Sequence, residues 1–281
     1  MSELRPEVAE ALGLGPEASW ERRIDLIRRF PANLTPEETI ALLTAMMEPC
    51  PPDVSFSTHS TYMHELACIL QQHGEIRLLF AQGLASLAAD DNRDDVTRDY
   101  SVQHLRQVWS RASNDTALRT SLEETLRDFT GLDSVIATPS LLALHMLGTE
   151  LGADPGYIGS PESPSPVQTT AGGTPPVYHL PDSVLGPLIK PIMAGKTTRE
   201  NMPARMTALR IVGERKMADF RGDLLTILKN SGEHALVRMA AAHAVGKIAN
   251  PEDLAALASL DPGDARVATA LRHALNPKPA N

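Results

Sequence analysis

Apolar residues recur along almost the whole chain at the three- and four-residue spacing of amphipathic helices, and no segment shows the clear alternation of a strand. The pattern therefore predicts an all-α protein. Capping residues mark several helix starts: Thr35 stands before Pro36, Asp115 before a run rich in Ala and Leu, and Asn250 before Pro251. The expected helices span residues 5–13, 18–30, 36–47, 59–73, 75–89, 95–111, 116–129, 139–150, 182–194, 203–217, 219–230, 234–249, 251–259 and 264–275.

The segment from Gly152 to Pro187 interrupts this helical pattern. It holds 8 of the chain's 22 prolines, so it cannot form one continuous helix. It is either a flexible linker or a long ordered loop, and its centre, residues 159–176, is expected to be either disordered or docked on the helices. The insertion divides the chain into an N-terminal helical region, residues 1–151, and a C-terminal one, residues 188–281.

A ten-residue pattern repeats within the predicted helices. The stretch Val237–Gly246 aligns without a gap with Ala204–Gly213, 33 residues earlier, and both copies have arginine second and glycine last. Weaker copies start at residues 97, 139 and 265. At 100° per residue the arginine lies on the apolar face, so we expect its stem to be buried and its head to find an acceptor. The recurring arginines are Arg98, Arg205, Arg238 and Arg266.

These copies resemble the HEAT-repeat family, particularly its short alanine-rich bacterial members. The resemblance is good from about residue 203 to 276, moderate from about 90 to 150, and poor before residue 50. It implies a right-handed α-solenoid of HEAT-like helical hairpins, in which the arginine-bearing second helices tend to line the concave side. The family pattern also has an acid in the turn before the arginine. Here the acids five residues ahead of Arg205, Arg238 and Arg266 are Glu200, Glu233 and Asp261.

A polar position recurs on the side of the second helices opposite the arginine. It is occupied by Gln103, His145, Arg210 and His243. If second helices line the concave side, these residues form a row that contacts a partner, although an ordinary solvated helix face explains the same residues. The leading hypothesis is therefore a scaffold or adaptor that binds another protein on its concave face, with no catalytic residues and no cofactor.

Two kinds of enzyme share this architecture and remain alternatives. Some HEAT-like proteins resemble phycobilin lyases, which would need a tetrapyrrole pocket, and others are alkylpurine DNA glycosylases, which hold duplex DNA in a basic concavity. The formal net charge is −9 and aromatic residues make up only 4% of the chain. These features argue most strongly against the glycosylase and against nucleic acid as a partner.

One helix carries a weak metal-binding pattern. The sequence HSTYMHELACILQQH places His64 and Cys68 four residues apart on one face, so it is similar to a zinc-binding HExxH motif with cysteine replacing the second histidine. Glu65 then stands where that motif has its general base. No third ligand follows nearby, and a half-buried structural cysteine beside surface histidines is the simpler interpretation.

Composition supports the prediction of an all-α protein, and the cysteine count and hydropathy indicate its cellular location. Apolar residues make up 42% of the chain, so with few aromatics the core must consist of Leu, Ala, Val, Ile and Met. Two cysteines, Cys50 and Cys68, are too few for a disulfide framework. The start of the sequence does not look like a signal peptide, and no segment approaches 18 apolar residues. We therefore expect a cytoplasmic protein without a membrane span.

Overall fold

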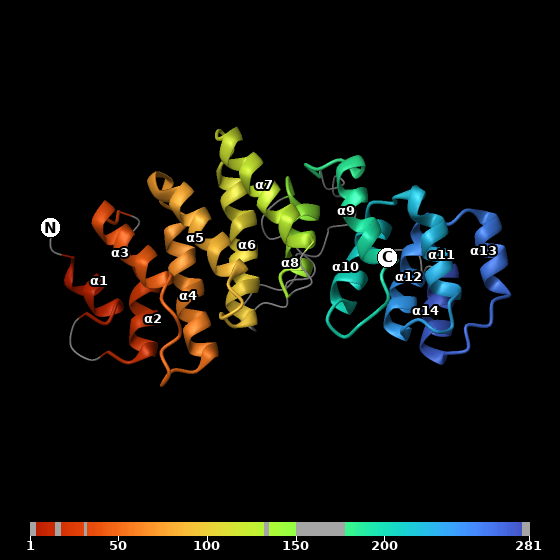
Figure 1. Ribbon diagram of the computed structural model, residues 1–281, viewed down its shortest axis with the longest axis horizontal. Helices are drawn as coiled ribbons and strands as arrows, with labels where there is room; N and C mark the ends of the chain where they lie inside the picture. The colour runs from red at the N-terminus through yellow and green to blue at the C-terminus, as the bar shows by residue number, and fades with distance from the viewer. Residues whose placement is uncertain (1–3, 15–17, 31–32, 132–134, 150–177, 277–281) are drawn as a thin grey trace. The chain divides into compact units, whose positions relative to one another are not determined.

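The computed structural model describes residues 4–14, 18–30, 33–131, 135–149 and 178–276. Every regular element in these ranges is a helix, which confirms the all-α prediction (Figure 1). The helices are α1 (Pro6–Ala11), α2 (Trp20–Arg28), α3 (Pro36–Met46), α4 (Phe56–Leu70), α5 (Arg77–Ala89), α6 (Asp95–Arg111), α7 (Thr116–Thr130), α8 (Ala137–Met146), α9 (Asp182–Ala194), α10 (Met202–Glu214), α11 (Arg221–Lys229), α12 (Ala235–Ile248), α13 (Pro251–Ala258) and α14 (Ala265–Leu275). Short 3-10 turns precede α5 and α11. None of these helices combines the length and the apolar character needed to cross a bilayer.

The predicted capping residues start their helices. Thr35 and Glu38 form a reciprocal capping box at α3, and Asn250 does the same at α13. The side chain of Asp115 accepts a hydrogen bond from the Leu118 amide at 3.0 Å. Helix α4 starts three residues earlier than expected because Ser55 caps it.

The chain divides into two compact units, unit 1 from Met1 to Phe129 and unit 2 from Thr130 to Asn281. The predicted boundary lay later, at residue 151. Helix α8 packs against α10, which places it with unit 2. Most of the Pro-rich insertion, including the centre for which disorder or docking was predicted, lies outside the described residues.

In unit 1 the helices pair in chain order, α1 with α2, α3 with α4, and α5 with α6. The second members of these pairs, α2, α4 and α6, also contact one another in series. Apolar side chains from both members of each pair form the core, in which Leu42, Leu66, Phe80 and Leu105 are fully buried. Each hairpin therefore covers the apolar face of its neighbour.

Unit 2 repeats the arrangement, with α8, α10, α12 and α14 in contact one after another. The recurring glycine of the sequence pattern lies where these helices touch. A Cβ on Gly213 would lie 2.8 Å from the Cα of Ala244, and one on Gly246 would lie 2.8 Å from the Cβ of Ala274. Only glycine permits this approach, so the repeated residue sets the spacing between second helices.

Three of the four repeat arginines are buried, as expected. Arg98, Arg205 and Arg238 are 6%, 3% and 4% exposed. Their guanidinium groups donate to carbonyl oxygens at or near the end of the preceding helix, those of Ala88, Met193 and Leu228. The arginines thus supply donors to carbonyls that the helix end leaves without an intrahelical partner.

Arg266, the fourth repeat arginine, departs from this arrangement. Its side chain is 64% exposed and pairs with Asp264 at 3.1 Å. In the described part of the chain no helix follows α14 to cover it, so the expected burial is wrong for Arg266. Arg23 in α2 instead donates to Ala11 at 2.9 Å, the same kind of contact, which the repeat pattern had not indicated.

Candidate functional site

The predicted polar row is not uniform, because His145 is buried. Its side chain is 1% exposed, with Nε2 3.0 Å from Oε2 of Glu214. The guanidinium Nε of Arg215 donates to Nδ1 at 3.0 Å, and the ring of Tyr178 stacks at 4.7 Å. Tyr178, where the chain returns from the insertion, covers this histidine. His145 therefore does not face outward, as its place on the side opposite the repeat arginine had suggested.

Both ring nitrogens of His145 are therefore occupied. Burial, with the nearby charge of Arg215, holds its pKa below the usual value. Burial opposes ionisation of Glu214, but the hydrogen bond from His145 and the charge of Arg210 lower the pKa of that carboxyl. A neutral imidazole donating to a carboxylate follows, which is a structural contact with no free nitrogen for catalysis.

The other row residues lie nearer the surface. Gln103 is half-buried in unit 1 and donates to Asp99 at 2.9 Å. Arg210 on α10 is half-exposed and 3.7 Å from Glu214, while His243 on α12 is exposed. Since α10 and α12 are neighbours, Arg210 and His243 are the two members of the row that unit 2 presents to solvent. Their contact with a partner stays a prediction.

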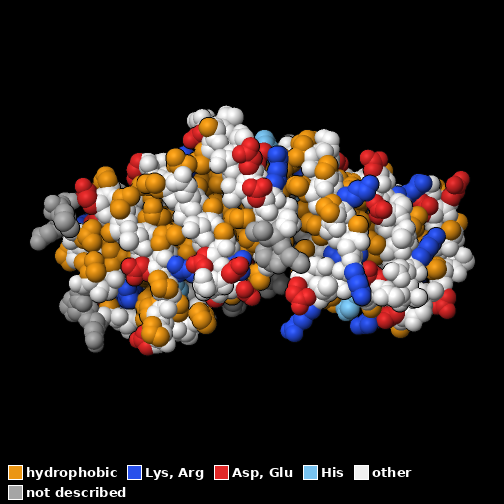
Figure 2. Space-filling view, viewed as in Figure 1, with side chains coloured by type: hydrophobic (Ala, Val, Ile, Leu, Met, Phe, Trp, Pro, Cys, Tyr) orange, Lys and Arg blue, Asp and Glu red, His pale blue; other side chains and the backbone are white. Residues whose placement is uncertain are grey.

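A large hollow lies elsewhere on unit 2. It has a volume of about 870 Å³ and is bounded by the end of α9, the turn before α10, helix α11 and the turn before α12. Its exposed basic residues are Lys190, Lys196 and Arg199, against one exposed acid, Asp223. In the view of Figure 2, Lys and Arg side chains gather on the helices of unit 2, while unit 1 shows more hydrophobic surface.

The floor of the hollow is held by a buried ion pair. Nη1 of Arg205 lies 2.9 Å from Oε2 of Glu233, and Nη2 donates to the carbonyl of Met193 at 2.7 Å. The hydroxyl of Thr197 contacts both members of the pair. The carboxylate of Glu233 is thus paired within the floor, and the exposed charged residues around the hollow have a net positive charge.

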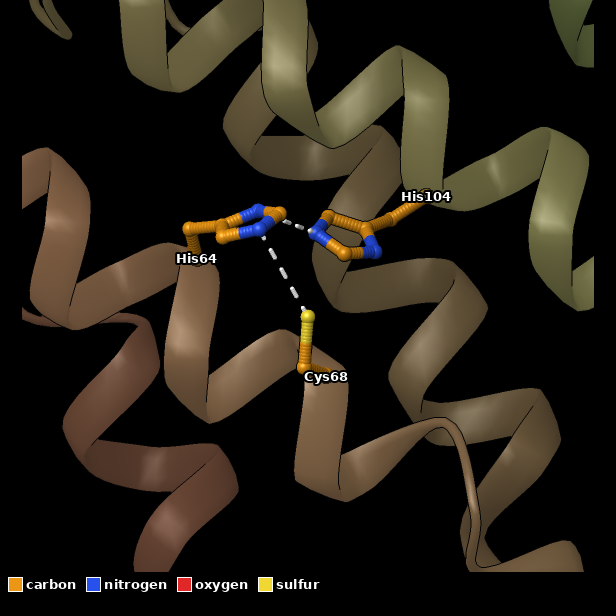
Figure 3. A group of neighbouring side chains, drawn as sticks. All are labelled: His64, Cys68 and His104. Carbon is orange, nitrogen blue, oxygen red and sulfur yellow. Dashed lines mark hydrogen bonds between the residues drawn. The ribbon is translucent and has the colours of Figure 1, made fainter. Parts of the chain in front are cut away.

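A second candidate site lies between α4 and α6 in unit 1. His64 and Cys68 from α4 meet His104 from α6 (Figure 3). Nδ1 of His64 is 3.1 Å from Nε2 of His104, and Sγ of Cys68 is 3.6 Å from Nε2 of His64. One possible ligand atom from each residue lies within 4.8 Å of the others.

Burial keeps these three side chains neutral without a metal. It lowers the pKa of His64, raises that of the Cys68 thiol to about 11, and lowers that of His104 to about 3. The arrangement that satisfies both contacts has the Cys68 thiol donating to His64, whose Nδ1–H donates to His104. A thiol with a raised pKa is a poor nucleophile, so the group is not a cysteine-protease-like dyad.

The sequence pattern identified only part of this cluster. Glu65, in the general-base position of the motif, pairs instead with Arg28 at 2.8 Å and does not join the three donors. His104 stands 40 residues after His64, next to the row residue Gln103, and the motif search did not reach it. The packing of α4 against α6 places His104 beside His64 and Cys68. No local spacing marked it, since its distance of 40 residues from His64 differs from the 33-residue spacing of the repeat.

Comparison with known proteins identifies the repeat family. A model of HEAT repeats matches residues 190–276, so this part of the chain consists of HEAT repeats, as the sequence pattern predicted. The solved structure of human deoxyhypusine hydroxylase in complex with glycerol is similar at 18% identity and a TM-score of 0.35, over 96% of this chain and 93% of that chain. No curated protein matches the chain.

Proposed function

We propose that this HEAT-repeat protein is a scaffold that binds another protein through unit 2. The hollow of about 870 Å³ carries the proposal. Its volume is in the range of sites that enclose a ligand, and its floor is held in place by the Arg205–Glu233 pair. A hollow bounded by two successive repeat turns suits an extended segment of a partner chain.

The charge around the hollow indicates the chemistry of that segment. Lys190, Lys196 and Arg199 are exposed, while the carboxylate of Glu233 is already paired. Complementarity favours a partner segment with acidic side chains. The net charge of −9 for the whole chain opposes a polyphosphate backbone as the main partner.

The residues that line the hollow also favour the scaffold function over the two enzyme alternatives. None of the described residues around the hollow is Phe, Tyr or Trp. A tetrapyrrole or an extruded base is usually held against aromatic faces. The lining therefore favours a protein segment over the phycobilin-lyase-like and glycosylase-like functions. The cytoplasmic location stays a prediction.

The exposed part of the polar row offers a second surface. Arg210 and His243 would add contacts on α10 and α12, whereas Gln103 and His145 are engaged in internal hydrogen bonds. The two surfaces can be tested independently, because no residue of the row lines the hollow.

The test first identifies the partner by cross-linking in the native cell and affinity purification, and then measures its affinity for variants by calorimetry. We expect the double variant Lys196→Glu and Arg199→Glu to weaken binding about tenfold or more, because reversed rim charges repel an acidic segment. Arg210→Glu with His243→Glu tests the row.

The matched control reverses two exposed arginines of unit 1, Arg22→Glu and Arg29→Glu. It changes the net charge as much as the hollow variant does. If binding falls equally in this control, general electrostatics explains the loss. If binding survives both unit 2 variants in folded protein, the scaffold surface is elsewhere and the proposal is wrong.

A further inference from the structure

The three side chains between α4 and α6 are all donors for thiolate-binding metals. Zinc and copper(I) bind cysteine sulfur and histidine nitrogen, whereas magnesium and calcium need oxygen ligands. The donor group here contains one thiol and two imidazoles, and the nearby carboxylate of Glu65 is held by Arg28 at 2.8 Å. The chemistry of the cluster therefore favours a soft or borderline ion.

The distance between Cys68 and His64 fits tetrahedral coordination. With bonds of about 2.3 Å to sulfur and about 2.0 Å to nitrogen, tetrahedral geometry places sulfur and nitrogen about 3.5 Å apart. Sγ of Cys68 and Nε2 of His64 are 3.6 Å apart. An ion binds only one of the two nitrogens of His64. One ligand atom of each residue already lies within 4.8 Å of the others, so small side-chain rotations would bring all three to bonding distance of one ion.

The surroundings admit an ion but no organic substrate. A cavity of about 10 Å³ adjoins His64 and His104, and Met46, Met63 and Tyr100 also line it. This volume holds about one water molecule. His104 is 2% exposed, so the site is enclosed on the α6 side. Three protein donors leave the fourth tetrahedral position to one water molecule, so a bound ion would tie two successive repeats together with no room for an organic substrate.

We propose that His64, Cys68 and His104 bind one closed-shell d10 metal ion, Zn²⁺ or Cu⁺, through one thiolate and two imidazole nitrogens. The Cys68 S–H bond breaks, its electron pair forms the sulfur–metal bond, and the proton leaves to solvent. The oxidation state of the ion does not change. The site links α4 to α6 within unit 1 and is independent of partner binding by unit 2.

The test uses the full chain, stripped of metal with a chelator and titrated with Co²⁺ as a spectroscopic substitute for Zn²⁺. We expect one equivalent to produce a thiolate-to-cobalt charge-transfer band in the near ultraviolet and the strong visible bands of a tetrahedral site. Zn²⁺ should then remove both. A parallel titration with Cu⁺ against a chromogenic chelator distinguishes the two ions.

The second cysteine supplies a matched control. Cys68→Ser should abolish the charge-transfer band, while Cys50→Ser, which changes a half-buried loop thiol, should keep it. His104→Gln should lower the affinity, and the exposed His243→Gln should not. Circular dichroism checks that each variant is folded.

A further measurement on the unaltered protein does not depend on any variant folding. The rate at which an alkylating reagent modifies Cys68, relative to Cys50, should fall when Zn²⁺ or Cu⁺ is added, because the bound thiolate is no longer free. A protein that shows no thiolate-to-cobalt band and no protection of Cys68 by either ion would overturn the proposal. A band retained in folded Cys68→Ser would do so as well.

Discussion

Arg205 of one repeat pairs with Glu233 in the turn before the next second helix, with Nη1 2.9 Å from Oε2 and side-chain exposures of 3% and 10%. The sequence pattern had assigned Glu233 to Arg238 and Glu200 to Arg205. Glu200 is exposed instead. The acid therefore pairs with the arginine of the preceding repeat. Stacking of the repeats places the turn before α12 beside α10, the second helix of that preceding repeat. Arg238 contacts the following turn in the equivalent way, since its Nη2 donates a hydrogen bond to the carbonyl of Pro262 at 2.9 Å.

The first prediction concerns this link between repeats. Arg205→Met should lower the free energy of unfolding by about 2–4 kcal/mol, because it leaves Glu233 and the Met193 carbonyl without their charged donor. Urea unfolding followed by circular dichroism measures the loss. Arg266→Met removes the exposed arginine of the last described repeat and should change the stability very little. Equal losses in the two variants would contradict a role for the buried link.

The recurring glycine gives a second prediction. Gly213→Ala should destabilise the protein by about 1–3 kcal/mol, because the new methyl would lie 2.8 Å from the Cα of Ala244 and must push α10 from α12. Gly222 in α11 has nothing within 4 Å of its Cβ position. Gly222→Ala should therefore stabilise by about 0.4–1 kcal/mol. Thermal unfolding of the two variants should give shifts of opposite sign, and shifts of the same sign would refute the close-packing argument.

A third prediction concerns acid stability. Arg5 hydrogen-bonds Glu38 and, against the effect of burial, lowers the pKa of this carboxyl from 4.5 to about 2. Because the folded value is the lower one, the pair stabilises the fold above about pH 4.5, and this contribution disappears as the pH falls towards 2. Its size is about 1–2 kcal/mol, since Arg5 is 33% exposed and water screens the pair.

Unfolding midpoints in urea, measured from pH 7 to pH 3, test this dependence. Glu38→Gln should lower the midpoint at pH 7 and flatten its decline with acid. The neighbouring Glu37 is exposed, so Glu37→Gln serves as the control and should retain the decline of the unaltered protein. A Glu38→Gln variant with an unchanged pH profile would show that the pair is not a source of acid sensitivity.

The fourth prediction concerns the return of the chain from the insertion. Arg215 donates to the Leu180 carbonyl at 2.6 Å and to Asp182 at 3.1 Å, and its guanidinium lies 4.1 Å from the Tyr178 ring centre. Arg215→Gln should release this segment, so that chymotrypsin cleaves after Tyr178 about 5- to 30-fold faster, the equivalent of one or two kcal/mol. Mass spectrometry of the fragments locates the cuts.

The control for this experiment is Arg221→Gln, which removes a more exposed arginine paired with Asp253 at 3.3 Å. Its cleavage pattern should match that of the unaltered protein. Unchanged cleavage in Arg215→Gln would mean that other contacts hold the segment in place.

The sequence by itself determined the elements of this protein and the roles that depend on one helix. Caps such as Thr35 and Asn250, and the burial of Arg205 and Arg238, follow from residues within a turn or two of each other. The 33-residue repeat then identified the HEAT repeats that the family comparison matches. Local spacing carries this information because a helix has a fixed number of residues per turn.

Only the tertiary structure decided which side chains meet. It joined His104 to His64 and Cys68, paired Arg205 with Glu233, and buried His145 beneath Tyr178 and against Arg215. Each of these contacts joins residues at least 28 positions apart along the chain. They depend on the offset and rotation between packed helices. Those are set by the volumes of many side chains at once, including the missing Cβ of Gly213, and not by any local spacing.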